Sequence, residues 1–171
     1  MKSFSLQKGL TLIELIVVCA IIGIFAAAVI AALNPFEQLK KTTDAKRKAD
    51  IGQVQRALEL YYQDQGRYPP SSADYKIYIN PQTINWGSSW QPYIGKLPSD
   101  SNLSHTYIYY SPPAANGQTY YIYANLERGA KDTQVCNAGN ACASMSTSGY
   151  PAANSCGATC NYGVSSSNVS P

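Results

Sequence analysis

The sequence predicts an α+β fold: a long, kinked N-terminal helix, transmembrane in its first half, whose second half packs on a small antiparallel β-sheet. Residues 10–33 are almost entirely apolar, and residues 34–67 carry apolar side chains three to four positions apart. Residues 106–125 hold two short stretches rich in tyrosine and β-branched residues, which are typical of strands. A low-charge, Cys-containing C-terminal loop region, residues 133–171, completes the chain of 171 residues. This length suits one modest domain and an appendage.

Charged residues are scarce and unevenly placed. They make up 13 % of the chain, with a formal net charge of +3, and none lies in residues 15–36 or 133–171. Because the positive charge is weak and no basic stretch is interleaved with aromatic residues, no nucleic-acid site is evident. The sequence contains no nucleophile elbow and no phosphate loop, and its single histidine is His105. We therefore expect no catalytic residues and no enzyme activity.

The apolar stretch over residues 10–33 is long enough to cross a membrane. As a helix its 24 residues would rise about 36 Å, against a hydrocarbon core of about 30 Å. A secretory signal peptide is the alternative, because two lysines precede the stretch and small residues, 26–28, lie near its end. The stretch is longer than the usual apolar segment of about 7 to 15 residues and contains Glu14. These two features favour a single transmembrane helix.

Glu14 is the one charged residue within this stretch, and two explanations are open. A charge at the bilayer centre costs about 2.5 to 3.5 kcal/mol, less near the edge, and such groups usually have a partner. Near the helix start, the carboxylate could meet the positive end of the helix dipole and reach outward. Alternatively it awaits a cation from another molecule, since no lysine or arginine lies between Lys8 and Lys40.

A short basic leader ends at Gly9, which is followed by the residues LTLIE and then by the rest of the apolar stretch. This arrangement resembles the class III leader and N-terminal helix of type IV pilins and type II secretion pseudopilins. The resemblance implies that residues 1–9 are a leader peptide, removed by prepilin peptidase with a cut between Gly9 and Leu10. It also implies N-methylation of Leu10 and a pilin-like fold.

The implied cleavage supplies a partner for Glu14. The new amine at Leu10 is cationic, and a neighbouring subunit shifted along a filament axis could place this amine against the Glu14 carboxylate. In a low-dielectric helix bundle such an ion pair favours the register that satisfies both charges. We therefore expect Glu14 to act in assembly, as a register device rather than a large source of stability.

Asn34-Pro35 interrupts the apolar stretch and predicts a helix kink at Pro35, because proline lacks the backbone N–H that a helix interior needs. Residues 34–67 then form an amphipathic helix with Ile51 and Leu58 on its apolar face. This helix resembles that of the major type II secretion pseudopilin. Its charged residues are interpreted as a solvated face: Lys46, Arg47, Lys48, Asp50, Arg56 and Glu59.

Residues 68–132 are predicted to form the β-sheet head. Residues 106–111 and 118–125 read as a hairpin whose turn contains proline and glycine. Residues 71–100 alternate turn signals with short apolar pieces and are expected to form a connecting region, with their two tryptophans in the head core. The tyrosines are expected to pack on the helix, with subunit contacts or adhesion as the alternative.

The C-terminal region contains Cys136, Cys142, Cys156 and Cys160, which predict two disulfides. Three connectivities are open. A zinc site is the less favoured alternative, because the cysteines are separated by five and three residues and the chain has a single histidine.

The resemblance to major pseudopilins also implies a calcium-binding loop late in the head. No Asp or Glu follows Asp132, so calcium would have to rely on main-chain carbonyls or on Asp132 or Asp100. We therefore predict no cofactor and no metal site, with calcium as the alternative. This departure favours a type IV pilin over a type II secretion pseudopilin.

The resemblance as a whole implies a structural subunit of a type IV pilus-like filament, polymerised through its N-terminal helix. Its partners would be copies of itself in a helical homopolymer, membrane lipid before assembly, prepilin peptidase, and the inner-membrane assembly platform with its ATPase machinery. The precursor would span the cytoplasmic (inner) membrane once, with its N-terminus in the cytoplasm. The filament would then lie at the cell surface or in the periplasm.

Two alternative functions stay open. The chain could be the pseudopilin of a type II secretion or DNA-uptake system. In a different class, it could be a membrane-anchored or secreted binding domain that never polymerises.

Overall fold

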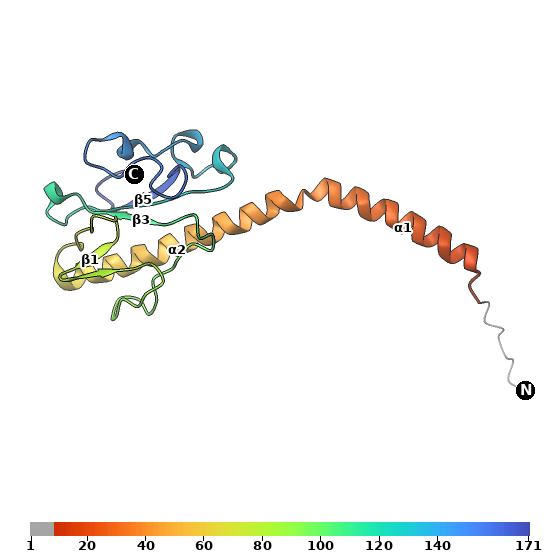
Figure 1. Ribbon diagram of the computed structural model, residues 1–171, viewed down its shortest axis with the longest axis horizontal. Helices are drawn as coiled ribbons and strands as arrows, with labels where there is room; N and C mark the ends of the chain where they lie inside the picture. The colour runs from red at the N-terminus through yellow and green to blue at the C-terminus, as the bar shows by residue number, and fades with distance from the viewer. Residues whose placement is uncertain (1–8) are drawn as a thin grey trace, which may run out of the picture. The chain divides into compact units, whose positions relative to one another are not determined.

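The computed structural model describes residues 9–171, so the predicted leader lies outside the described residues except for Gly9. The chain divides into two compact units, Met1–Leu39 and Lys40–Pro171, and each is described by itself. The second unit is called the head below. Figure 1 labels the two helices and some of the strands along the chain.

Two helices form the N-terminal part of the chain. Helix α1 spans Leu12–Leu33, and helix α2 spans Pro35–Gln65. Between them Asn34 adopts the left-handed conformation, with φ 43° and ψ 72°. Pro35 takes the first position of α2, where its missing N–H costs little. A helix boundary therefore lies where the sequence predicts a kink.

The head contains a three-stranded antiparallel sheet. Strands β3 (Ile108–Tyr110), β4 (Tyr121–Ala124) and β5 (Tyr162–Ser165) lie in the order β3-β4-β5. Tyr109 pairs with Ile122, which pairs in turn with Val164. The hairpin predicted from residues 106–125 is confirmed, with β3 and β4 as its strands. Strand β5 was not predicted, because its residues YGVS lie in a Ser- and Gly-rich region without an alternating apolar pattern.

The two faces of this sheet contact different parts of the head. Tyr107, Tyr109, Tyr120, Ile122 and Ala124 share a buried core with Ile51, Val54 and Leu58 of α2. The alternate residues of β3 and β4 share a second core with the cysteine-containing C-terminal region. Figure 1 accordingly shows α2 on one side of the sheet and the C-terminal region on the other. This layering buries every residue of β3 and β4.

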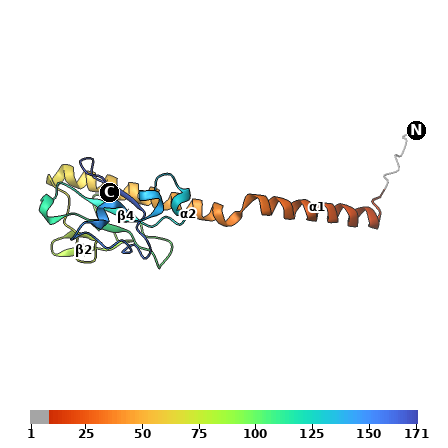
Figure 2. The ribbon, with the colours of Figure 1, turned by 90° about the horizontal axis from the view of Figure 1, so that it is seen from above.

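The remaining elements are short. A two-stranded hairpin, β1 (Ile77–Ile79) with β2 (Gln82–Ile84), lies within the predicted connecting region. Trp90 is buried against the rings of Tyr61 and Tyr93, as expected for a core tryptophan. The C-terminus lies beside β5, where Pro171 is close to Gly163 (Figure 1), and Figure 2 shows the same end of the chain near β4. Four 3-10 helices complete the described elements: η1 (Pro113–Ala115), η2 (Gly129–Lys131), η3 (Cys136–Gly139) and η4 (Ala143–Ser146).

Candidate assembly site

Helix α1 presents apolar side chains on every side. Residues Leu12–Ile30 form a stretch long and apolar enough to cross a membrane, and none of it is buried within the structure. Leu12, Ile24 and Phe25 are 77 %, 72 % and 67 % exposed. A helix that is apolar all round is typical of a membrane span or of a helix packed among other chains, so α1 is a candidate membrane-spanning helix by its length and composition.

The predicted cleavage position lies in a non-helical segment immediately before α1. Gly9 and Leu10 are exposed, and Leu10 is 74 % exposed. A Cβ atom added at Gly9 would meet nothing within 4 Å. Packing among the described residues therefore gives no reason for a glycine at this position, and the Gly9–Leu10 peptide bond is accessible.

Glu14 lies in the first turn of α1. The Glu14 backbone N–H donates a hydrogen bond to the Thr11 hydroxyl at 3.3 Å, and the Leu15 N–H donates to the Thr11 carbonyl at 3.1 Å. Thr11 is thus the N-cap of α1, in the Thr-x-x-Glu spacing of a capping box. This cap was not predicted from the sequence, although the Thr-x-x-Glu spacing indicates it. Among the described residues no lysine or arginine precedes Lys40, so none of the described lysines and arginines lies within α1 beside Glu14.

The prediction that the charged face of α2 is solvated is partly wrong. Arg47 and Asp44 are each 1 % exposed, and Asp50 is 7 % exposed. The Arg47 guanidinium binds Asp100 through two hydrogen bonds, Nε–Oδ2 at 2.7 Å and Nη2–Oδ1 at 3.2 Å. Its Nη2 also lies 3.2 Å from Glu127 Oε1. Arg47 is buried because loops distant in sequence bring the carboxylates of Asp100 and Glu127 to the helix, and Asp44 is buried because it accepts the backbone N–H groups of Glu127 and Arg128.

The Arg47 guanidinium and the Asp100 carboxylate shift each other's pKa values. Burial alone would lower the pKa of the Arg47 guanidinium, but the hydrogen bond to Asp100 and the nearby carboxylates raise this pKa above its usual value. Burial would conversely raise the pKa of the Asp100 carboxyl, but the hydrogen bonds from Arg47 and from the Asn102 backbone lower it below 3.8. Both groups are therefore held in their charged forms at neutral pH.

Several tyrosines of the head pack on α2, as predicted, and three of them also donate hydrogen bonds to the helix, whereas Tyr110, Tyr121 and Tyr123 pack against the C-terminal region. The Tyr107 hydroxyl donates to Asp50 Oδ2 at 2.7 Å, and the Tyr68 and Tyr120 hydroxyls donate to Glu59 at 3.0 Å and 3.2 Å. Burial and the hydrogen bond to Asp50 raise the pKa of Tyr107. These hydroxyls stay protonated and link the sheet to the helix.

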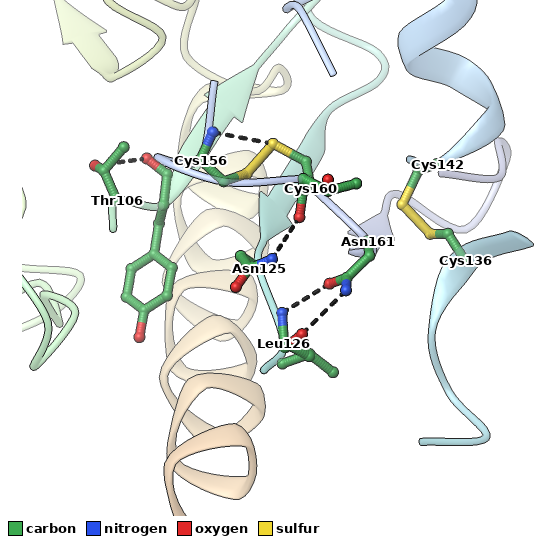
Figure 3. The surroundings of a disulfide bond; sticks show 10 residues. Thr106, Asn125, Leu126, Cys136, Cys142, Cys156, Cys160 and Asn161 are labelled. Carbon is green, nitrogen blue, oxygen red and sulfur yellow. Dashed lines mark hydrogen bonds between the residues drawn. A yellow bond between two sulfur atoms is a disulfide. The ribbon is translucent and has the colours of Figure 1, made fainter. Parts of the chain in front are cut away.

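The C-terminal region contains two disulfides, Cys136–Cys142 and Cys156–Cys160 (Figure 3). The zinc alternative is therefore wrong. Near them, the Asn161 side chain accepts a hydrogen bond from Leu126 N–H at 2.7 Å and donates one to Leu126 O at 3.0 Å. The two disulfides close local turns, since their cysteines are six and four positions apart.

The head residues do not fit a calcium site. Both carboxylate oxygens of Asp132 contact Lys48 Nζ, and both those of Asp100 contact Arg47. Within residues 9–171 there is no group of three or more His, Cys, Asp or Glu side chains that could hold a metal ion. Calcium needs about six to eight oxygen ligands, so the two carboxylates named from the sequence do not form such a site.

The chain has an exposed apolar helix, an accessible Gly-Leu bond before that helix, and a head in which a second helix packs on a small sheet. Together these features are typical of the class of pilins and pseudopilins. A family model of the prokaryotic N-terminal methylation motif matches residues 4–30. A second, of type II secretion system protein G, matches residues 34–140. The chain belongs to the type II secretion system protein G family.

Individual relatives agree with this family. The type II secretion system core protein G of Pseudomonas aeruginosa is 35 % identical over 135 residues, which cover 75 % of this chain and 92 % of the relative. That of Vibrio cholerae is 32 % identical over 116 residues, covering 66 % and 76 %. A type IV major pilin protein of Neisseria gonorrhoeae is 35 % identical over 80 residues, covering 47 % of each chain. No solved structure matches this chain.

Proposed function

We propose that this protein is the major pseudopilin of a type II secretion system, a non-enzymatic subunit that polymerises through α1 into a periplasmic filament. The observation that carries the proposal is the similarity to a core protein G over 92 % of that relative's length. The similarity to a pilin covers 47 % of each chain. We therefore favour a pseudopilin over a pilus subunit. The preference for a pilus subunit rested on the absence of Asp and Glu side chains after Asp132.

Before assembly, α1 would hold the precursor in the inner membrane, with the N-terminus in the cytoplasm. Prepilin peptidase would cut between Gly9 and Leu10 and methylate the Leu10 amine; the exposure of both residues supports this step. The assembly platform and its ATPase would then bring subunits together, and the apolar surface of α1 would pass from lipid to the helices of other copies. Burial of apolar area supplies the driving force among subunits.

Glu14 would set the register of this assembly. The charged amine of Leu10 in one subunit would pair with the Glu14 carboxylate of a neighbour. Two unit charges about 4 Å apart attract by about 4 kcal/mol at an effective dielectric constant of about 20, before the cost of desolvating them. A subunit placed out of register would leave both charges unpaired in an apolar bundle, so the pair selects one arrangement.

The test is deletion of the gene in its own bacterium, followed by complementation with the wild-type gene or with Glu14→Gln. We expect exported proteins to accumulate in the periplasm of the deletion strain, surface pili to be unchanged, and only the wild-type gene to restore secretion. Loss of surface pili with normal secretion would instead support a pilus subunit. Normal pili and normal secretion would contradict both filament functions.

A further inference from the structure

The Lys48 side chain of α2 reaches the start of the C-terminal region. Its Nζ atom lies 2.7 Å from each carboxylate oxygen of Asp132 and 2.8 Å from Gln134 Oε1. The ring of Tyr162, in β5, lies on another side, with its centroid 5.7 Å from Nζ. One ammonium group is thus surrounded by three oxygen atoms and an aromatic face, contributed by segments far apart in sequence.

Asp132 is held in place for this contact by its own turn. Its carboxylate also accepts the Gln134 backbone N–H at 3.0 Å, and its backbone N–H donates to the Gly129 carbonyl at 2.9 Å. Its side chain is 10 % exposed, and that of Lys48 is 21 % exposed. Burial alone would raise the pKa of Asp132, but the hydrogen bonds from Lys48 and Gln134 lower it. The carboxylate is therefore charged and held in position, and both of its oxygens contact the lysine.

The disulfides do not provide this connection to the helix. Cys136–Cys142 and Cys156–Cys160 each join residues within the C-terminal region itself. Two residues after Gln134, the Cys136 N–H donates to the Asn161 carbonyl at 2.7 Å, so the chain enters the disulfide-closed part directly from the Lys48 contact. Lys48 therefore ties α2 to a region that the disulfides close only locally.

A divalent cation fits this position poorly on grounds of charge. The Lys48 ammonium and the Asp132 carboxylate sum to zero, whereas a calcium ion on one carboxylate would leave a net positive charge in a partly buried site. No Asp or Glu side chain follows Asp132 to supply a second carboxylate. The donor set consists of one carboxylate and one amide oxygen, far fewer than the about six to eight oxygens that calcium takes.

We propose that the Lys48 ammonium holds the C-terminal region against α2. In this role it takes the place of a bound divalent metal ion. The head therefore folds and keeps its C-terminal region in place without calcium. This inference concerns the stability of the head and does not depend on the proposed role in secretion, so a secretion phenotype of either sign leaves it intact.

The first test needs no substitution. The thermal unfolding of the full-length protein in a mild non-ionic detergent is followed by near-ultraviolet circular dichroism, which reports the buried tyrosines. The measurement is made with calcium chloride at millimolar concentration, the range of weak extracellular sites, and again with EGTA. We expect the same Tm in both. A Tm that rises with calcium or falls with EGTA would overturn the proposal.

The second test compares Lys48→Met with Lys46→Met, a matched change at an exposed lysine on the same helix. We expect Lys48→Met to lower Tm by about 4 to 10 °C, since charged hydrogen bonds are lost and Asp132 keeps a partly buried, unpaired charge. Lys46→Met should lower Tm by less than about 2 °C. Equal effects of the two variants would overturn the proposal.

A double variant covers the case in which Lys48→Met does not fold. In Lys48→Met with Asp132→Asn the unpaired carboxylate is removed, so we expect a folded protein whose Tm exceeds that of the single variant and does not respond to calcium. A double variant no more stable than Lys48→Met would mean that Asp132 is not the partner of Lys48. That result would also overturn the proposal.

Discussion

Helix α1 and the head differ in where their side chains find partners. In α1 the residues from Leu12 to Ile30 are unburied, and the Thr11 side chain caps the helix by accepting a hydrogen bond from the Glu14 backbone N–H. In the head, apolar side chains fill two cores, and even Arg47 is 1 % exposed with carboxylates around it. The head thus buries apolar and charged side chains against one another, whereas the apolar side chains of α1 are exposed. This difference supports the proposal that α1 is the element through which subunits assemble.

The largest expected effect concerns Glu14, the one charged residue of α1. We expect Glu14→Gln and Glu14→Ala to insert into the membrane and to be cleaved, yet to form no filaments, because the partner of the Leu10 amine is lost. Immunoblotting for the mature form and electron microscopy of sheared filaments measure the two steps. Glu14→Asp, which keeps the charge, is the control and should retain part of the assembly. Normal filaments from Glu14→Ala would remove this role.

Arg47 differs from Glu14 because it forms ion pairs with carboxylates of the head itself. Arg47→Met leaves the buried carboxylates of Asp44 and Asp100 without their cation, so we expect a loss of about 3 to 5 kcal/mol of unfolding free energy. Arg56→Met, at an exposed position of the same helix, should cost less than about 1 kcal/mol. Denaturant unfolding of the full-length protein in detergent measures both. A loss as small as that of Arg56→Met would show that the cluster contributes little.

A matched pair of isoleucines sharpens the comparison of the two regions. Ile51 is 0 % exposed in the head, and Ile22 is 60 % exposed in α1. Ile51→Ala should cost about 2 to 5 kcal/mol in the same unfolding measurement, because it leaves a cavity. Ile22→Ala should leave the unfolding of the head unchanged and reduce the yield of filaments. A destabilised head in Ile22→Ala would contradict the separation of roles.

Several features of the fold and the site could be predicted from sequence because they depend on neighbouring residues. The apolar run of α1 and the strands around the turn at residues 112–117 show in local patterns. The burial of Arg47 could not be predicted, since it depends on Asp100 and Glu127, which approach from distant loops. Strand β5 was missed because its place comes from pairing with β4 rather than from its own residues. The cap at Thr11, by contrast, could have been found from its spacing to Glu14.

The smallest expected effect is the response of the head to acid. The pKa values of Asp100 and Asp132 are lowered below 3.8 in the folded protein, mainly by hydrogen bonds that oppose the effect of burial. These groups therefore stabilise the head fully above the pKa of the unfolded chain, and this contribution is lost as pH falls below about 4. Unfolding free energy measured against pH should fall less steeply in Asp100→Asn than in the wild type. Identical slopes would show that Asp100 makes no such contribution.

The most direct test of the central claim, that α1 is a processed assembly element, is the mass of the N-terminal peptide of the mature protein. The protein is purified from cells that contain prepilin peptidase, and its N-terminal peptide is analysed by mass spectrometry. We predict a chain that begins at Leu10 and carries one methyl group on its amine. An intact Met1 would indicate a plain membrane anchor, and a start near Val29 would indicate ordinary secretion; either result would contradict the account.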